Sequence, residues 1–198
     1  MDSRRLIAIL TGLALAVATG LGAYSLVGVF EDERESIGQV AIGGPFSLVD
    51  HSGRRVSEAD FKGRHMLLYF GYTFCPDVCP TELQAMSEAL DALGPDAAGV
   101  QPVFISIDPE RDTPAVLAEY RQHFHDKFRM LTGTLEEIRA AAKTFRVYFT
   151  KVDDDGSDDY LMDHSSVVYL LDGEGRYVAH FGPNTASEEM ARRIREAI

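Results

Sequence analysis

The stretch Phe74-Cys75-Pro76-Asp77-Val78-Cys79-Pro80 contains both cysteines of this 198-residue chain. The apolar and aromatic run that precedes it, residues 65–72, is typical of a buried strand. After it, apolar residues recur at helical spacing from Leu83 to Leu93, which predicts an amphipathic helix. Pro80 suits the first turn of that helix, because its missing N–H costs nothing there. We therefore expect the two cysteines at the junction between a strand and a helix.

The spacing of the cysteines limits what their sulfurs do. Cys75 and Cys79 are four positions apart, so their side chains share one face of a helical backbone. A helix that begins near Cys79 places both sulfurs at the positive end of its dipole, which favours thiolate over thiol. Two such sulfurs either form a disulfide or bind a soft metal ion. A purely structural disulfide is less favoured, since closing a loop of about five residues removes only roughly 2 kcal/mol of unfolded-state entropy.

An uncharged segment, residues 6–30, predicts one transmembrane helix. At about 1.5 Å per residue it spans about 37 Å, which exceeds the ~30 Å of bilayer hydrocarbon. Arg4 and Arg5 precede it and four acidic residues follow within 31–35, so residues 1–5 are predicted to be cytoplasmic and the rest exported. A cleaved signal peptide with a site near residues 16–18 is the alternative, but its apolar region is usually only about 7–15 residues long.

The exported part is acidic. Residues 31–198 hold all but one of the chain's 31 acidic side chains and all but two of its 19 basic ones, for a net charge of −13. Such a domain is a poor partner for nucleic acid and suits cationic partners or metal ions. Two cysteines in an exported protein point to an oxidising compartment, where a dithiol needs a supply of electrons. We assign residues 31–44 to a linker and 45–198 to one domain.

The order of predicted elements in the domain indicates an α/β fold. A hairpin over 46–56 comes first, and strands over 65–72 and 101–108 each precede a helix, the second of which has Thr113 as its predicted cap and Pro114 in its first turn. A brief strand at 128–133, a helix with capping-box spacing from Thr134, a late hairpin over 166–181 and a last helix with Ser187 as its predicted cap complete the chain. This order is the plan of thioredoxin, a central sheet flanked by helices. The acidic residues 153–159 lack the glutamate that an EF-hand needs at its twelfth position, so they predict a solvated loop.

His164 is the candidate third ligand. It lies in Asp163-His164-Ser165-Ser166, just before the late hairpin, and in a thioredoxin plan this loop passes beside the cysteines. Two thiolates and an imidazole suit copper, and a three-coordinate site suits Cu(I) in particular. A structural zinc ion would need a fourth protein ligand. Asp77 and Asp163 either tune the basicity of the neighbouring ligands through hydrogen bonds or are exposed turn and cap residues.

Three motifs together resemble the Sco/SenC family, namely Gly71–Pro80, Ser106–Pro114 and Asp163–Ser166. That family is described as membrane-anchored, thioredoxin-like copper proteins that help to assemble the binuclear copper-A centre in subunit II of cytochrome c oxidase. The resemblance implies that Cys75, Cys79 and His164 are copper ligands. It also implies that the acidic segment belongs to an inserted hairpin that carries the histidine. The single anchor without a long presequence implies a bacterial inner-membrane protein with its C-terminal domain in the periplasm.

Two functions are compatible with this site. A copper metallochaperone would hold Cu(I), and Cu(II) as a second candidate state, and pass it to the copper-A domain of subunit II; a copper donor and a thiol reductant are further expected partners. A thiol-disulfide oxidoreductase would instead use Cys75 and Cys79 to reduce the acceptor's copper-ligand cysteines, although their spacing differs from C-x-x-C. A peroxiredoxin-like activity is less favoured, because it needs a single activated cysteine.

Overall fold

The apolar run before the cysteines forms the central strand β3 (His65–Gly71), which is buried from its second residue onward. It pairs parallel with β4 (Val100–Ser106), and β4 pairs parallel with β5 (Arg129–Thr132). On the other side of β3, β8 (Val168–Leu171) is antiparallel and is followed by β9 (Tyr177–Phe181). The continuous apolar sequence of β3 follows from its central place, because a strand covered on both faces has no solvent side to make polar.

The computed structural model describes residues 42–152 and 160–198. The predicted transmembrane helix over 6–30 and most of the predicted linker lie outside the described residues. Within the described ranges, no helix is both long and apolar enough to cross a membrane. The last linker residues, 42–44, already contact the domain, since the Gly43 N–H donates a hydrogen bond to the Thr144 carbonyl at 2.9 Å.

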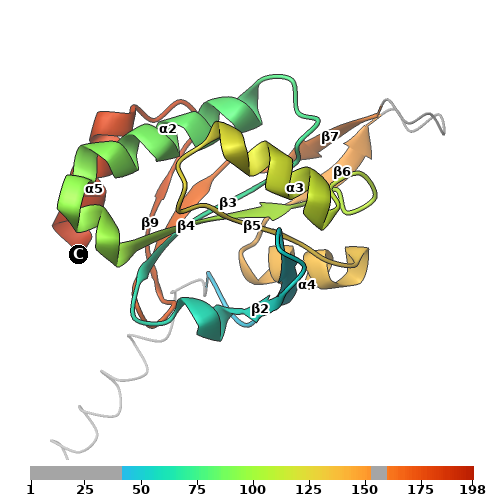
Figure 1. The fold of residues 1–198 in the computed structure, drawn as a ribbon, viewed down its shortest axis with the longest axis horizontal. Coiled ribbons are helices and arrows are strands. Elements are labelled where there is room, and N and C mark those ends of the chain that lie inside the picture. Colours follow the sequence, from blue (N-terminus) through green and yellow to red (C-terminus); the bar gives the residue numbers. More distant parts are fainter. Residues whose placement is uncertain (1–41, 153–159) are drawn as a thin grey trace, which may run out of the picture. The chain divides into compact units, whose positions relative to one another are not determined.

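The sheet has seven strands in the order β2-β1-β5-β4-β3-β8-β9. The front hairpin, β1 (Ser47–Asp50) and β2 (Arg55–Ser57), is confirmed and joins the sheet by antiparallel pairing of β1 with β5. Helices α2 (Val78–Leu93), α3 (Pro114–Tyr120) and α5 (Ser187–Ala197) lie on one face, and α4 (Leu135–Thr144) lies on the other (Figure 1). The predicted thioredoxin-like arrangement of sheet and helices is thus confirmed.

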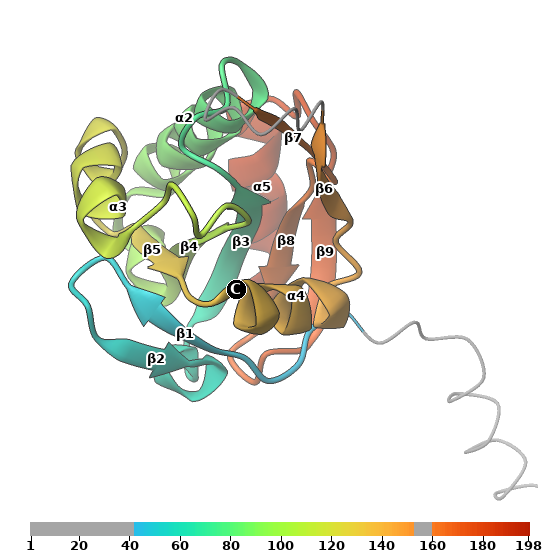
Figure 2. The ribbon, with the colours of Figure 1, turned by 90° about the vertical axis from the view of Figure 1, so that its right-hand side faces the viewer.

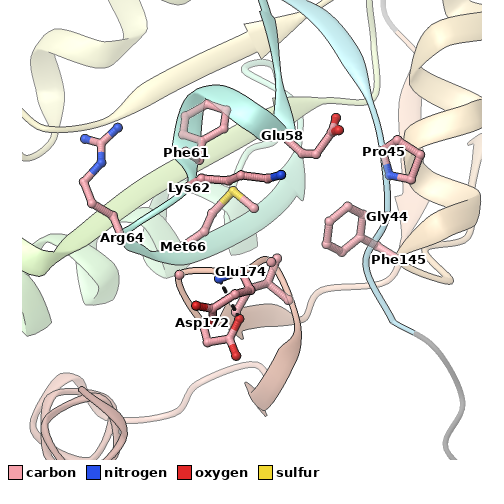
Figure 3. Close-up of a pocket in the computed structure, with 13 residues that line it drawn as sticks. Gly44, Pro45, Glu58, Phe61, Lys62, Arg64, Met66, Phe145, Asp172 and Glu174 are labelled. Atoms are coloured by element: carbon pink, nitrogen blue, oxygen red, sulfur yellow. Dashed lines mark hydrogen bonds between the residues drawn. The ribbon is translucent and has the colours of Figure 1, made fainter.

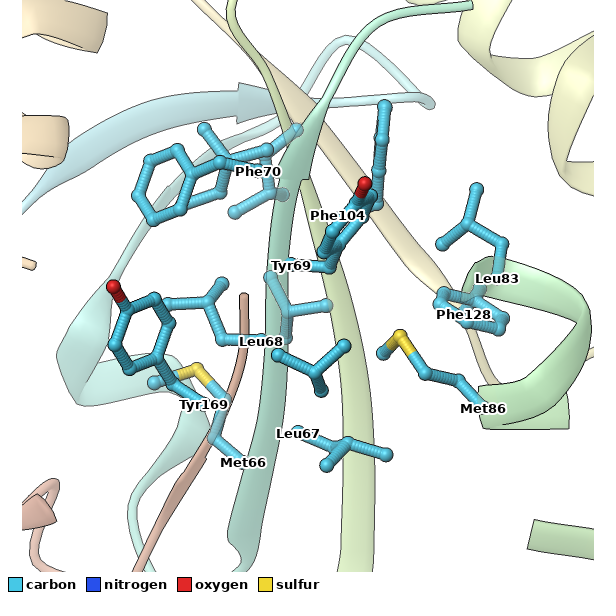
Figure 4. Close-up of a cluster of buried hydrophobic side chains, with 14 of the residues drawn as sticks. Met66, Leu67, Leu68, Tyr69, Phe70, Leu83, Met86, Phe104, Phe128 and Tyr169 are labelled. Carbon is cyan, nitrogen blue, oxygen red and sulfur yellow. The ribbon is translucent and has the colours of Figure 1, made fainter. Parts of the chain in front are cut away.

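Alternation along β3 divides the core between the two faces of the sheet. Phe70 lies with Tyr169 on one side of the strand, and Tyr69 lies with Phe104 and Leu83 on the other (Figure 4). All of these side chains except Tyr169 are inaccessible to solvent, and Tyr169 is 6% exposed. Because each face of β3 is packed, a change in its register would move large side chains into filled space.

Capping residues fix the starts of two helices as the sequence predicts. The Thr113 hydroxyl accepts a hydrogen bond from the Val116 N–H at the start of α3. Thr134 and Glu137 form the predicted capping box of α4. The predicted cap of the last helix is wrong, because Ser187 is the first helical residue of α5 and no side chain caps that helix. Short 3-10 helices occupy Glu58–Phe61, Gly94–Gly99 and Arg121–His123.

A second, two-stranded sheet consists of β6 (Phe149–Val152) and β7 (Leu161–His164). This is the hairpin that the family resemblance implies, and His164 is the last residue of its second strand, opposite Phe149. The acidic residues 153–159 lie outside the described residues. In two perpendicular views the hairpin lies at the same end of the main sheet as the loop that enters α2 (Figures 1 and 2). The fold therefore brings the histidine segment to the cysteines.

Candidate metal centre

Both cysteines lie where β3 passes into α2. Cys75 is in the connecting loop and Cys79 is the second residue of the helix, with its N–H 3.4 Å from the Cys75 sulfur. Both are free thiols; Cys79 is completely buried and Cys75 is 9% exposed. The helix thus starts one residue before Cys79, as the sequence predicts, and an amide of its first turn points at the outer sulfur.

His164 lies beside these sulfurs although it is 85 positions away from Cys79 in the chain. Its Nε2 is 3.5 Å from the Cys79 Sγ, and its Nδ1 is 3.3 Å from the Ser165 carbonyl oxygen. The ring stands edge-on to Tyr69 and to Tyr72, with ring centroids 6.0 Å apart in each case. Nδ1 can donate its proton to the Ser165 carbonyl, and in that neutral tautomer Nε2 offers a lone pair to a metal ion, as a ligand must.

The two thiols do not ionise alike. Hydrogen bonds from Cys79, from the His164 imidazole and from main-chain N–H groups lower the pKa of Cys75 far below that of a free thiol, against the opposing effect of burial. The hydrogen bond with Cys75, together with burial, raises the pKa of Cys79. The metal-free pair therefore holds one proton between two sulfurs, and a cation that displaces this proton gains two thiolates.

The spacing of sulfur and nitrogen fits a shared soft ion. An ion about 2.3 Å from a thiolate sulfur and about 2.0 Å from an imidazole nitrogen holds the two atoms roughly 3.3–3.7 Å apart at bond angles of about 100–120°. The 3.5 Å between Cys79 Sγ and His164 Nε2 lies in this range. Among the described residues, no three His, Cys, Asp or Glu side chains already form a closed metal site. Side-chain adjustments must therefore bring the two sulfurs and the imidazole nitrogen around one ion.

Three residues that the sequence analysis did not single out lie around Cys79 and the hairpin. The Tyr69 hydroxyl lies 3.8 Å from the Cys79 sulfur, and a Cβ at Gly71 would lie only 2.9 Å from it. Tyr72 also contributes, because its hydroxyl accepts a hydrogen bond from the Met162 N–H of β7 at 3.2 Å. The sequence feature that could have indicated this is the pair of tyrosines in and directly after an apolar strand, just before the cysteines. A buried tyrosine hydroxyl needs a polar partner, and the cysteine segment is close by.

The two aspartates that flank the ligands are both exposed. Asp77 precedes α2, and its side chain makes no capping hydrogen bond. Asp163 lies on β7 beside His164, but the imidazole Nδ1 faces the Ser165 carbonyl. The contribution of Asp77 comes from its main-chain N–H, which helps to lower the pKa of Cys75. Both side chains are therefore exposed, but Asp77 occupies the N-cap position without capping the helix, and Asp163 is a strand residue and not a turn residue.

Three of the other histidines have partners elsewhere in the domain. His51 Nδ1 accepts a hydrogen bond from the Met130 N–H, and His125 lies within 4 Å of Asp91 and Asp126. His180 Nδ1 is 2.6 Å from the Tyr177 hydroxyl. None of these contacts involves a sulfur.

A hollow of about 210 Å³ lies at the other end of β3, around Met66, Phe61 and Phe145 (Figure 3). Its lining contains no cysteine and no histidine. Since Met66 is near the start of β3 and the cysteines follow the strand's end, this hollow is separate from the candidate metal centre.

One turn after Cys79, the carboxyl group of Glu82 is buried beside the site. One oxygen accepts a hydrogen bond from the Asn184 N–H at 2.8 Å, and the other has no partner among the described residues. Burial raises the pKa of Glu82, and the Asn184 hydrogen bond only partly opposes this. The folded state therefore favours the protonated acid.

We predict that Glu82→Gln stabilises the chain at neutral pH. The pKa of Glu82 is raised in the folded state, so protonated Glu82 contributes its full stability below about pH 4, the pKa of a glutamate in the unfolded chain. This contribution is lost as pH rises through the folded-state pKa. Glutamine does not titrate, so its advantage should be near zero at pH 4 and grow toward pH 7.5, measured by urea unfolding. Glu88→Gln, on an exposed position of α2, is the control; an equal pH dependence in both variants would contradict the prediction.

The fold and the site together define a class: thioredoxin-like domains that bring two thiols and an imidazole to the start of one helix. The family model described as SCO1/SenC matches residues 34–198. The chain is 46% identical to Protein sco1 of Schizosaccharomyces pombe, over 92% of this chain and 74% of that protein. The chain therefore belongs to the SCO1/SenC family, and the predicted resemblance is confirmed.

Solved structures of relatives have the same fold. The copper-bound ScoI of Bradyrhizobium japonicum superposes with a TM-score of 0.74 at 44% identity, covering 80% of this chain and 100% of that one. A more distant structure is described as identifying a disulfide switch in BsSco, a member of the Sco family of cytochrome c oxidase assembly proteins. It matches with a TM-score of 0.63 at 25% identity over 80% of this chain and 94% of that one.

Proposed function

We propose that this protein is a copper metallochaperone that holds copper with Cys75, Cys79 and His164 during the assembly of cytochrome c oxidase. The observation that carries the proposal is the 3.5 Å approach of His164 Nε2 to the Cys79 sulfur across 85 residues of chain. Two sulfurs and one imidazole nitrogen form a soft donor set, which selects copper over hard cations. The copper-bound relative and the oxidase-assembly relative support this assignment.

Copper is the cargo of this site, and the residues of the chain load and release it. The Cys75 thiolate is the ready ligand, because its pKa is lowered by its neighbours. Cys79 has to give up its proton for the second sulfur to bind, and the raised pKa of Cys79 opposes this step. His164 binds without losing a proton when Nδ1 carries the hydrogen. Binding of one copper ion thus releases one proton, and the proton's competition for Cys79 leaves the site able to give the copper up.

The proposed acceptor is the copper-A domain of oxidase subunit II, which receives copper by ligand exchange onto its own thiolates. Segments that carry the site expose large apolar side chains, as a partner surface does: Phe74 is 54% exposed, Tyr148 64% and Leu161 48%. Phe74 precedes Cys75, and the Tyr148 carbonyl accepts a hydrogen bond from the Ser165 N–H next to His164. A copper donor and a thiol reductant complete the expected set of partners.

A thiol-disulfide oxidoreductase is the second candidate, favoured by the unequal ionisation of the two cysteines. The Cys75 thiolate would attack an acceptor disulfide and release one acceptor thiolate. Cys79 would then lose its proton and attack the Cys75 sulfur, which forms the Cys75–Cys79 disulfide and releases the second acceptor thiol. The raised pKa of Cys79 slows this second step. Because a disulfide cannot bind copper, this chemistry would also switch copper loading off.

We further propose that residues 6–30 anchor the protein in the cell inner membrane with the copper-binding domain in the periplasm. Support comes from the uncharged length of this segment and from the arginines that precede it. An oxidising periplasm also explains why the function of the two thiols depends on a supply of electrons.

The test of the proposed function is His164→Ala in the reduced full-length chain. Loss of one of three ligands should weaken Cu(I) binding by about 100-fold or more, measured by competition with a chromophoric Cu(I) chelator. His125→Ala is the matched control, because His125 contacts Asp91 and Asp126 instead of the sulfurs. Equal copper affinity in the two variants would refute the proposed ligand set and leave the redox function.

A further inference from the structure

The hairpin that carries His164 depends on side-chain contacts for its position. Strands β6 and β7 form a sheet of their own, separate from the seven-stranded sheet. A two-stranded hairpin alone is marginally stable in water. A hollow of about 230 Å³, lined by residues 107–110 and by residues of α4, β6 and β7, shows that packing beneath the hairpin is incomplete. Specific contacts must therefore hold the imidazole at the sulfurs.

Arg111, in the loop that follows β4, makes several of these contacts. Its Nη1 donates to the Tyr160 carbonyl at 3.0 Å, just before β7, and its Nε donates to the Asp108 carboxylate at 2.5 Å. The guanidinium carbon lies 3.7 Å from the centroid of the Tyr160 ring. The Tyr160 hydroxyl donates to the same Asp108 carboxylate at 2.6 Å. Arg111 and Asp108 together therefore hold both the main chain and the side chain of Tyr160.

The same loop holds the cysteine side of the site. The buried Asp112 carboxylate accepts hydrogen bonds from the Thr73 N–H at 3.1 Å, from the Thr73 hydroxyl at 2.5 Å and from the Ser106 hydroxyl at 2.5 Å. The Arg111 guanidinium carbon also lies 4.6 Å from the centroid of the Phe74 ring, directly before Cys75. Through Asp108, Arg111 and Asp112, this one loop thus contacts both the cysteine loop and the histidine hairpin.

Helix capping does not account for these contacts. The start of α3 is capped by Thr113, whose hydroxyl accepts from the Val116 N–H. The side chains of Asp108, Arg111 and Asp112 bind Tyr160, Thr73 and Ser106 instead of the first amides of α3. The sequence motif therefore carries a second role besides starting a helix.

We propose that the segment Asp108–Asp112 is a clamp that sets the separation between the His164 imidazole and the two sulfurs, with Arg111 as its positioning residue. The clamp rests on the proposed copper site, whose ligands it brings together. A planar guanidinium packs against two rings while it donates to a carboxylate and a carbonyl at fixed angles. Lysine keeps the charge, but its ammonium has no plane to pack on the rings, and all its donors lie on one nitrogen, which cannot reach the carboxylate and the carbonyl in the same geometry. Arg111→Lys should therefore loosen the hairpin without changing the net charge.

The first arm of the test needs no metal. Amide hydrogen exchange of the reduced full-length chain should become about 10-fold faster at Met162 and Ser165 in Arg111→Lys. Both amides tie the hairpin, to the Tyr72 hydroxyl and to the Tyr148 carbonyl respectively. Arg129→Lys is the matched control, because Arg129 pairs with buried Asp50 on a strand outside the candidate metal centre. Exchange at both amides that is no faster than in this control would overturn the clamp.

The second arm asks whether Arg111 acts through His164. Arg111→Lys should weaken Cu(I) binding about 10-fold in the wild-type background and have little effect in the His164→Ala background, a non-additive cycle. An additive cycle would overturn the positioning role and leave a general structural one. If His164→Ala itself leaves copper binding unchanged, the proposed function fails, and the exchange arm still decides the clamp. Tyr160→Phe removes only the hydroxyl bond to Asp108, so it should also accelerate amide exchange in the hairpin, but by less than Arg111→Lys does.

Discussion

Cys79→Ser should lower the Cu(I) affinity of the reduced chain by at least about 1000-fold. Serine keeps the size and the buried place of the side chain but offers a hard neutral hydroxyl where Cu(I) prefers a soft thiolate. Such a fall corresponds to about 4 kcal/mol of binding free energy. Because the Cys79 sulfur is also the atom that lies 3.5 Å from His164 Nε2, its loss removes the centre of the donor set. Chelator competition with Cu(I) measures the effect.

The control for this substitution is Met86→Leu, on the same helix. Met86 is completely buried, so the change removes a sulfur from the packed face of α2 while keeping the volume and the two cysteines. We expect normal copper affinity in this variant. Copper binding that survives in Cys79→Ser, with its fold verified by circular dichroism, would contradict the assignment of Cys79 as a ligand.

Gly71→Ala should destabilise the fold by about 1–3 kcal/mol and weaken copper binding as well. An added Cβ would lie 2.9 Å from the Cys79 sulfur and 3.0 Å from ring carbons of both Phe104 and Tyr69. All three neighbours are completely buried, so none can move aside into open space. Relief requires displacement of α2 from β3, which also moves the sulfur relative to His164.

Urea unfolding of Gly71→Ala gives the loss of stability, provided that the slope with denaturant stays the same. Gly182→Ala is the matched control, because a Cβ at that position meets nothing within 4 Å. Equal stabilities of the two variants would show that β3 and α2 pack less tightly than the contacts at Gly71 indicate.

Much of the fold follows from local sequence. The run over 65–72 predicts β3 because its length and apolar character suit a strand covered on both faces. Thr113 and Thr134 predict the starts of α3 and α4, since a hydroxyl at the cap satisfies an amide only a few residues away. The wrong prediction of a cap at Ser187 shows the limit of such rules, because the same residue type also serves as a first helical residue.

The candidate site is only partly local. Cys75 and Cys79 are four residues apart, so they lie close together on any helical backbone, and the pair is evident in the sequence. His164 is predictable only by placing its segment within a thioredoxin plan or by family resemblance. Arg111 lies in the Ser106–Pro114 motif, but the motif did not indicate its role, because its partners, Tyr160 and Phe74, lie in two other segments of the chain. Such contacts depend on the directions of side chains from distant segments, which the spacing of residues in the sequence does not determine.

By itself, the sequence determined most of the elements, the place of the two sulfurs at the start of a helix and the acidic balance of the domain, because short-range sterics, amide capping and composition decide these properties. Only the tertiary structure decided that His164 Nε2 lies 3.5 Å from the Cys79 sulfur, and that the pKa of Cys75 is lowered while that of Cys79 is raised. Those features arise from burial and from contacts between residues far apart in the chain, which exist only once β3, α2 and the β6–β7 hairpin have packed together.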